Sequence, residues 1–289
     1  MKIAVFPEHS SIAGRPVFQA FIDSLGDEGV GPSMDGDAAV IWSLLWSGRM
    51  KGNQQIWNHY RSQNKPVIVL EVGNIRRNVT WKVGINGINN DAIWPMADGE
   101  RRLDLVTKPW RESTPSDAVV ICGQHGASEQ WKDMPSVSDW MIEMCKTVRS
   151  HSSRKIILRP HPRFDVIPDQ TRKMSNVLIM KPRHVEGSYD DFDFNKCLTT
   201  AHAVVCHSSG PAVTSILNGV PAFVSSHSLA HPVGNDINDL SKIENPLLPD
   251  REQWADNISY TEWTLKEISQ GVPWRRLRDQ VKSLSITQY

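Results

Sequence analysis

Residues 203–225 read AVVCHSSGPAVTSILNGVPAFVS, and the succession of strand and helix that we predict for this protein is clearest here. The stretch begins and ends with short runs of apolar and β-branched residues, 203–206 and 222–225, which are typical of buried strands. Between these runs, a glycine and a proline introduce the segment 211–218, whose apolar residues recur at helical spacing. Strand, helix and strand in this order predict parallel strands joined by a crossover helix.

The same alternation extends on both sides, through residues 115–249, which we predict to form one domain. The segment 137–150 has the apolar spacing of a helix, and another helix is expected to begin near Asp190. Further buried strands are expected at 118–122, 155–158 and 177–180. In doubly wound sheets of this kind, ligands bind at the edge formed by the carboxyl ends of the strands.

Residues 1–114 repeat the pattern and are predicted to form a second α/β domain across a cleft from the first. Its expected strands and helices are 2–6, 16–25, 38–42, 54–63 and 67–70. Residues 74–114 are rich in Gly, Asn, Asp and Arg and are expected to form long loops. Residues 250–289 carry spaced aromatic residues, and we predict two or three helices that pack back across the domains.

The chain has 289 residues, enough for two domains of ordinary size, and its 39% hydrophobic and 22% charged residues are a normal globular balance. Lys plus Arg equals Asp plus Glu, 32 each, so no overall positive charge attracts nucleic acid or acidic membranes. No apolar stretch approaches the roughly 20 residues that cross a bilayer, and no signal-peptide core follows Met1. We therefore expect a cytoplasmic protein with no membrane span, whose four separated cysteines remain reduced.

The turn inside the quoted stretch is the first candidate site. It contains Ser208, Ser209 and Gly210, directly between a strand and a helix. Hydroxyl groups and backbone N–H groups there can bind a phosphate, and glycine permits close approach of a ligand. An ordinary helix cap is the alternative interpretation.

A second polar loop follows the strand 155–158. It contains Arg159, His161 and Arg163, separated by two prolines that stiffen the backbone. An imidazole and two guanidinium groups held in this way suit a phosphate site, although a rigid surface turn would look the same. Because this loop and the serine turn both follow parallel strands, we expect them to meet over one ligand. The turn after the strand 118–122 adds the candidates Gly123, Gln124 and His125.

These motifs resemble the donor half of GT-B glycosyltransferases, over about residues 118–226. A His-Pro loop followed by a serine pair and Gly-Val-Pro-Ala-Phe is similar to the bacterial capsule, Kdo, sialyl and teichoic-acid polymerase enzymes. The resemblance implies two Rossmann-type domains and donor-phosphate contacts by His161, Ser208 and Ser209. It also implies a donor-ribose contact by Glu244, a UDP-sugar as the donor, and no metal or tightly bound cofactor.

Three shorter strings, 81–84, 122–126 and 260–263, resemble small phage-encoded glycosyltransferases. That resemblance implies a 5-hydroxymethylpyrimidine of phage DNA as the acceptor, in the host cytoplasm. Neighbouring arginines at 76–77, 101–102 and 275–276 can supply local phosphate contacts, although solvated surface charge explains each pair equally well.

Transfer to a hydroxyl group needs a base from the first domain. Glu8, followed by His9, comes after the first strand, and Glu71 follows residues 67–70, so both are candidate bases. Asp91, in the Asn-rich loop, is a third candidate. We name His9, Arg76, Arg77 and Asp91 as candidate acceptor contacts.

The sequence Asp190-Asp191-Phe192-Asp193 imitates the metal-binding DxD motif of the other glycosyltransferase fold. We interpret these carboxylates as caps of the following helix. Two further hypotheses remain beside glycosyl transfer, to DNA or to a glycan: a sugar-nucleotide epimerase, and an inactive module that only binds nucleotides. Product formation without an acceptor would favour the first, and binding without transfer would favour the second.

Overall fold

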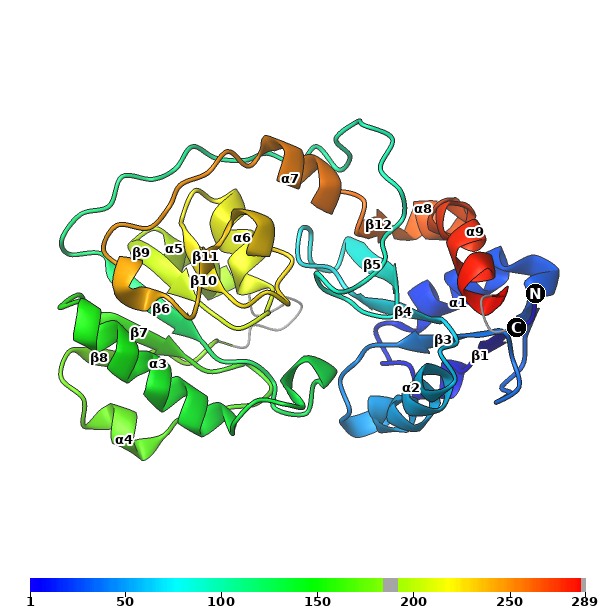
Figure 1. The fold of residues 1–289 in the computed structure, drawn as a ribbon, viewed down its shortest axis with the longest axis horizontal. Helices are drawn as coiled ribbons and strands as arrows, with labels where there is room; N and C mark the ends of the chain where they lie inside the picture. Colours follow the sequence, from blue (N-terminus) through cyan, green and yellow to red (C-terminus); the bar gives the residue numbers. More distant parts are fainter. Residues whose placement is uncertain (184–191, 287–289) are drawn as a thin grey trace. The chain divides into compact units, whose positions relative to one another are not determined.

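The computed structural model describes residues 1–183 and 192–286, and it divides into two compact units (Figure 1). Unit 1 comprises Met1–Leu105, Ala127–Glu129 and Asp256–Tyr289, and unit 2 comprises Val106–Gly126 and Gln130–Ala255. The predicted domain boundaries, after residues 114 and 249, differ from these. Residues 106–114 and 250–255 belong to unit 2, and the chain after residue 255 belongs to unit 1.

Unit 2 contains a parallel sheet with the strand order of a Rossmann fold. In chain order its described strands are β6 (Ala118–Cys122), β7 (Ile156–Arg159), β8 (Val177–Ile179), β9 (Ala201–Val205), β10 (Ala222–Val224) and β11 (Asn235–Asp236). In the sheet they lie in the order β8-β7-β6-β9-β10-β11, with all pairings parallel. Chain direction across the sheet therefore reverses between β6 and β9, which is where such sheets bind ligands.

The helices of unit 2 follow from apolar spacing. Helix α3 (Val137–His151) buries Trp140, Met141 and Cys145 against the apolar residues of β6 and β7. Every residue of β6 and β9 is buried, as a parallel strand covered on both faces requires. The remaining described helices are α4 (Asp169–Arg172), α5 (Phe192–Leu198) and α6 (Pro211–Leu217). The predicted Asp190 and Asp191 lie outside the described residues.

Unit 1 contains a mixed sheet. Its parallel strands are β1 (Ile3–Val5), β2 (Gly29–Val30), β3 (Ala38–Trp42) and β4 (Val67–Val72), and its antiparallel strands are β5 (Thr80–Ile85) and β12 (Glu262–Thr264). The order is β12-β5-β4-β3-β1-β2, so the direction reverses between β1 and β3. The parallel strands confirm the predicted α/β class. Helices α1 (Arg15–Ser24) and α2 (Asn53–Ser62) bury apolar residues against the sheet.

Sequence reasoning missed the two-residue strand β2 and two further elements of unit 1. The predicted loop region 74–114 contains β5, and the predicted all-helical tail contains β12 in addition to α7 (Glu252–Ile258), α8 (Leu265–Ser269) and α9 (Val272–Ile286). Strand β12 has only three residues and pairs with β5, which is about 180 residues earlier in the chain. A three-residue strand made by distant pairing leaves little local signal, so tertiary contact decided β12. Strand β5 has six residues and pairs with the preceding strand β4, but its charged Lys82 hid it among the polar residues of the region.

The four cysteines are buried and free, as expected from their spacing. Across the described ranges 1–183 and 192–286, no helix has both the length and the apolar character required to span a bilayer.

Candidate functional site

The carboxyl ends of β6 and β9 are joined by side-chain hydrogen bonds at the point where the direction of unit 2 reverses. Gln124, the second residue after β6, is buried in the turn that follows this strand. Its Oε1 accepts hydrogen bonds from the backbone N and the Oγ of Ser208, both at 3.2 Å. Two residues predicted from separate motifs are thus in contact.

The loop after β7 lies against the same turn. The backbone N of Gly123 donates to the carbonyl of Arg159 at 2.8 Å. A Cβ atom on Gly123 would lie 3.5 Å from the backbone N of His161, at ordinary contact distance, and 3.1 Å from Cε of Met141, so the two loops are adjacent and the absent Cβ leaves room for Met141. The rings of His125 and His161 meet edge to face, with centroids 5.4 Å apart. His161 and Ser208 therefore follow strands on either side of β6, with the β6 turn between them.

A backbone hydrogen bond determines the tautomer that we assign to His161. Its Nδ1 accepts from the backbone N of Arg163 at 3.1 Å. An accepting Nδ1 carries no hydrogen, so in the neutral ring Nε2 carries it and can donate to an anion. The neighbouring His125 stays neutral near pH 7, because burial and the charge of Arg163 lower its pKa. Arg163 itself is exposed.

Arg159 has a different partner from the predicted phosphate. Its side chain is only 5% exposed, and Nη2 lies 2.5 Å from Oδ1 of Asp193 in α5. Burial raises the pKa of Asp193, but the hydrogen bonds from Arg159 and from the backbone N of Arg183 outweigh it and lower that pKa. The guanidinium of Arg159 is thus engaged in an internal ion pair, and it holds the start of α5 against β7.

The serine turn contains buried polar atoms without partners. Within the described part of the chain, Oγ of Ser209 and Nε2 of His207 are buried and have no hydrogen-bond partner. Unpaired buried polar atoms are uncommon in folded proteins, and ligand sites are one place where they occur. Gly210 follows directly and precedes α6.

His207 was not among the predicted site residues, although it adjoins the serine pair. Its ring packs edge to face on Trp131, with centroids 5.4 Å apart, and lies 5.9 Å from the ring of His227. Burial, and then the charge of His227, lower the pKa of His207. The ring is therefore a neutral hydrogen-bonding group at neutral pH.

Glu244, which is predicted to contact the donor ribose, lies at the opposite edge of the sheet from the candidate site. Its Oε1 accepts from Oγ of Ser152 at 2.5 Å, and its Oε2 accepts from Nε of Arg154 at 2.9 Å. Ser152 and Arg154 precede β7, at the amino edge of the sheet, whereas the candidate site lies at the carboxyl edge. The edge at which Glu244 lies could not be predicted from its place after the last strand in the sequence, because the chain returns to the amino edge before it reaches Glu244.

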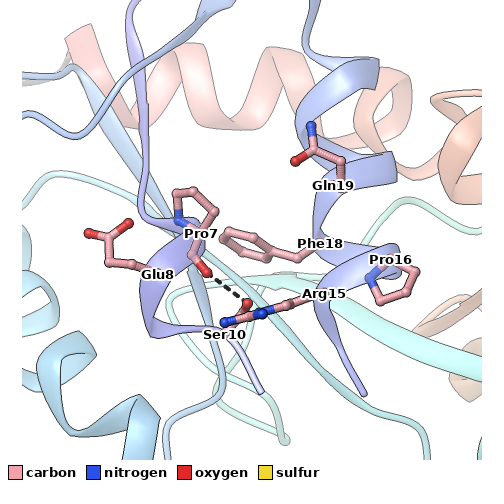
Figure 2. A pocket seen from close by; sticks show the side chains of 7 residues that line it. All are labelled: Pro7, Glu8, Ser10, Arg15, Pro16, Phe18 and Gln19. Atoms are coloured by element: carbon pink, nitrogen blue, oxygen red, sulfur yellow. Dashed lines mark hydrogen bonds between the residues drawn. The ribbon is translucent and has the colours of Figure 1, made fainter. Parts of the chain in front are cut away.

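In unit 1, the predicted Glu8 lines a hollow of about 470 Å³ at the carboxyl end of β1 (Figure 2). The hollow is formed by the loop after β1 and the first turns of α1. It is lined by Pro7, Glu8, Ser10, Arg15, Pro16, Phe18 and Gln19. The imidazole Nε2 of His9 lies 3.7 Å from Oε1 of Glu8.

The other predicted residues of unit 1 lie on and after β4. Glu71 is half-buried near the carboxyl end of that strand. Arg76 is exposed and lies 3.8 Å from the carboxylate of Asp104, and Asp91 is exposed in a turn. Arg77 is half-buried in the same loop as Arg76. Among the described residues, the lining of the hollow beside Glu8 does not include Glu71, Arg76, Arg77 or Asp91.

Among residues 1–183 and 192–286, no group of three or more His, Cys, Asp or Glu side chains is placed to hold a metal ion.

Comparisons with known proteins identify the class of fold. No protein-family model and no curated protein matches the sequence. Among solved structures, the chain is similar to the β-Kdo 2,7 transferase of Thermosulfurimonas dismutans KpsC, with 16% identity, a TM-score of 0.53, and coverage of 94% of this chain and 98% of that one. It is also similar to the β-Kdo 2,4 transferase of the same KpsC, with 13% identity, a TM-score of 0.50, and coverage of 99% and 98%. The fold is therefore GT-B-like, with two Rossmann-type units.

Proposed function

We propose that the protein is a glycosyltransferase that moves a sugar from a nucleotide-sugar donor to an acceptor hydroxyl, and that unit 2 binds the donor. The observation that carries this proposal is the contact between Gln124 and Ser208 across the β6/β9 reversal, with His161 beside it. In sheets of this order, phosphate-containing ligands bind at that point. The GT-B-like fold supports the same interpretation.

The proposed chemistry is stabilisation of the leaving group. When the bond between the anomeric carbon and the phosphate oxygen breaks, negative charge develops on the departing nucleotide. The Nε2–H of His161 donates to this phosphate, together with the hydroxyl group of Ser209. The hydroxyl of Ser208 donates to Gln124 in the described structure, and it joins them when phosphate replaces that acceptor. The exposed guanidinium of Arg163 adds positive charge nearby. Groups held in place before the reaction lower such a barrier without the cost of reorganisation.

Arg159 acts indirectly in this proposal. Because its charge is balanced by Asp193, it positions the loop that carries His161 and does not contact the phosphate. A UDP-sugar is the donor that we would test first.

The acceptor is either a 5-hydroxymethylpyrimidine in DNA or a hydroxyl of a saccharide. Three arginines that suggested DNA are engaged internally. Arg101 pairs with Asp256, Arg102 pairs with Glu267 and stacks on Trp263, and Arg276 pairs with Asp98. Arg76 and Arg275 are exposed, so fewer arginines are available for DNA phosphates than the sequence suggested. We therefore place a saccharide before DNA among the acceptors to be tested.

The test is a transfer assay with purified protein, with UDP-, CMP- and GDP-sugars each offered with duplex DNA containing 5-hydroxymethylcytosine or with oligosaccharides. We expect one donor to lose its nucleotide and a glycosylated acceptor to form, at rates reduced at least 100-fold in His161→Ala. Glu244→Gln, at the opposite edge, is the matched control. An altered sugar without any acceptor would instead identify an epimerase. Nucleotide binding without any transfer would identify a binding module.

A further inference from the structure

A serine with unusual backbone geometry follows β3 in unit 1. Ser43 has φ of 67°, in the left-handed region that residues other than glycine rarely adopt, and only 2% of its surface is exposed. Its backbone N donates to the carbonyl of Leu70 in β4 at 2.7 Å. Such backbone conformations persist where surrounding structure enforces them, and they are concentrated at functional sites.

This conformation directs the hydroxyl of Ser43 at a carboxylate. Oγ of Ser43 donates to Oε2 of Glu71 at 2.5 Å, and Oε1 of Glu71 accepts from the backbone N of Val72 at 2.7 Å. Each oxygen of a carboxylate can accept about two hydrogen bonds, so both retain capacity. Glu71 is half-buried, which leaves it fixed in orientation and still accessible.

Glu71 belongs to a row of three charged residues on adjacent strands. Lys82 of β5 lies directly opposite Glu71 of β4 on one side and Glu262 of β12 on the other. Lys82 is 3% exposed, and its Nζ donates to the carbonyl of Ile88 at 2.9 Å. Burial lowers the pKa of Lys82 to about 8, against the opposing effects of Glu262 and Glu71. Arg77 and Asp91 are the other charged groups that act on this lysine.

Glu262 cannot serve as a base, because it is 1% exposed and its oxygens are occupied. It accepts from the backbone N of Asn74 at 2.5 Å, from that of Ile75 at 3.1 Å and from Oγ1 of Thr80 at 2.7 Å. Its role is to hold the loop after β4. Glu71 is therefore the accessible carboxylate of the row.

Glu8, another candidate, is held less firmly. Its side chain is exposed, and its charged partner among the described residues is His9 at 3.7 Å. No hydrogen bond fixes its carboxylate in the described structure, whereas Glu71 has two. Catalytic groups need side chains locked by their surroundings.

We propose that Glu71 is the general base of the transferase reaction and that Ser43 is the residue that positions it. This inference rests on the proposed function. The proton of the acceptor hydroxyl moves to the carboxylate of Glu71 while the acceptor oxygen bonds to the anomeric carbon. The bond from that carbon to the phosphate oxygen breaks, and its electron pair leaves with the nucleotide. Ser43 keeps the carboxylate in one rotamer throughout.

The experiment compares Glu71→Gln, Ser43→Ala, Ser43→Gly and Glu8→Gln for donor affinity, kcat and acceptor KM, and for the pH profile of kcat. Removing a general base is expected to lower kcat about 10²- to 10⁴-fold. We expect this loss in Glu71→Gln, with donor affinity within threefold of wild type. Glu8→Gln should keep kcat within about threefold.

The two Ser43 variants separate positioning from backbone strain. Ser43→Gly relieves the strain and Ser43→Ala retains it, but both remove the hydroxyl group. We expect kcat to fall by a similar factor of roughly ten in both, with the acidic limb of the pH profile moved to higher pH. A loss in Ser43→Ala that Ser43→Gly restores would show a purely structural role and overturn the positioning claim.

Failure of this inference can be told from failure of the proposed function. An active wild-type enzyme with an active Glu71→Gln variant would overturn the base assignment alone. A wild-type protein that binds no donor and transfers no sugar would overturn both.

Discussion

The two edges of the unit 2 sheet differ in how their polar groups are satisfied. At the amino edge, Glu244 accepts from Ser152 and Arg154, and His202 contacts the carbonyl of Ile243 at 2.6 Å. Among the described residues, Nε of Arg111 and Nε of Arg149 also lack a partner at this edge, but each guanidinium donates through its other nitrogens. At the carboxyl edge, Nε2 of His207 and the hydroxyl of Ser209, the only polar atom of that side chain, have no partner in the described part of the chain. Both edges are rich in histidine, serine and arginine, so composition does not distinguish them.

This difference indicates that the hydrogen bonds made within the protein distinguish polar side chains that stabilise the fold from those that can bind a ligand. A network with all partners present stabilises the protein and offers nothing to a ligand. A set of donors held at the reversal point of a parallel sheet, with partners missing, is prepared for an anion. Substitutions should therefore affect stability at one edge and activity at the other.

Arg159→Ala is expected to have the largest effect on stability, although it lies at the carboxyl edge. The substitution leaves the carboxylate of Asp193 without its buried partner, which typically costs about 3–5 kcal/mol. Denaturant unfolding of the variant measures this loss. A stability change below about 1 kcal/mol, together with loss of activity, would instead support direct phosphate binding by Arg159.

His161→Ala is expected to reduce kcat/KM about 10²- to 10³-fold, because one donor to the developing charge is removed. The imidazole is half-exposed, so the midpoint of thermal unfolding should change little. Steady-state kinetics and a melting curve on the same preparation check both expectations. Wild-type activity in this variant would remove His161 from the site.

Glu244→Gln, at the amino edge, should have the opposite outcome, which is a loss of stability without a loss of activity. The amide can accept from Arg154 and donate to Oγ of Ser152, but it loses the charge that pairs with Arg154, so we expect a stability loss of about 1–2 kcal/mol with unchanged kcat/KM. Chemical unfolding measures the first quantity and the transfer assay the second. Loss of donor binding here would mean that the two edges are not functionally distinct.

Lys82→Met tests a buried charge in unit 1, and its effect on stability is spread over several pH units. The folded-state pKa of Lys82 is about 8, below the ordinary value of 10.5, so the unfolded state binds more protons between these values. Wild-type stability should therefore rise relative to Lys82→Met as pH increases from 8 to 10.5, by at most about 1.4 kcal/mol per pH unit. A constant difference across that range would show that Lys82 does not titrate there.

Much of the fold could be predicted, because the parallel strands are continuous apolar runs. The strand 118–122 matches β6, and the helix 137–150 differs from α3 by one residue. The antiparallel strands β5 and β12 could not be predicted in this way. Lys82 is a charged residue in a buried strand, and the three residues of β12 precede a helix whose capping box dominates the local signal.

For the candidate site, sequence reasoning identified strand ends but not the partners of each side chain. Gln124, His161 and Ser208 were predicted because each follows a strand, and parallel topology brings such positions together. Asp193 as the partner of Arg159, and Ser43 as the partner of Glu71, depend on pairings between distant segments. Ser43 also required a backbone conformation that its sequence does not signal.

The most direct test is calorimetric titration of UDP, CMP and GDP into wild-type protein, His161→Ala and Glu244→Gln. Binding of one nucleotide to wild type is expected with a dissociation constant of about 1 μM to 1 mM, the range common for enzyme substrates. His161→Ala should weaken it at least tenfold, and Glu244→Gln should leave it unchanged. If no nucleotide binds, or if the two variants weaken binding equally, the carboxyl edge of unit 2 is not a phosphate site.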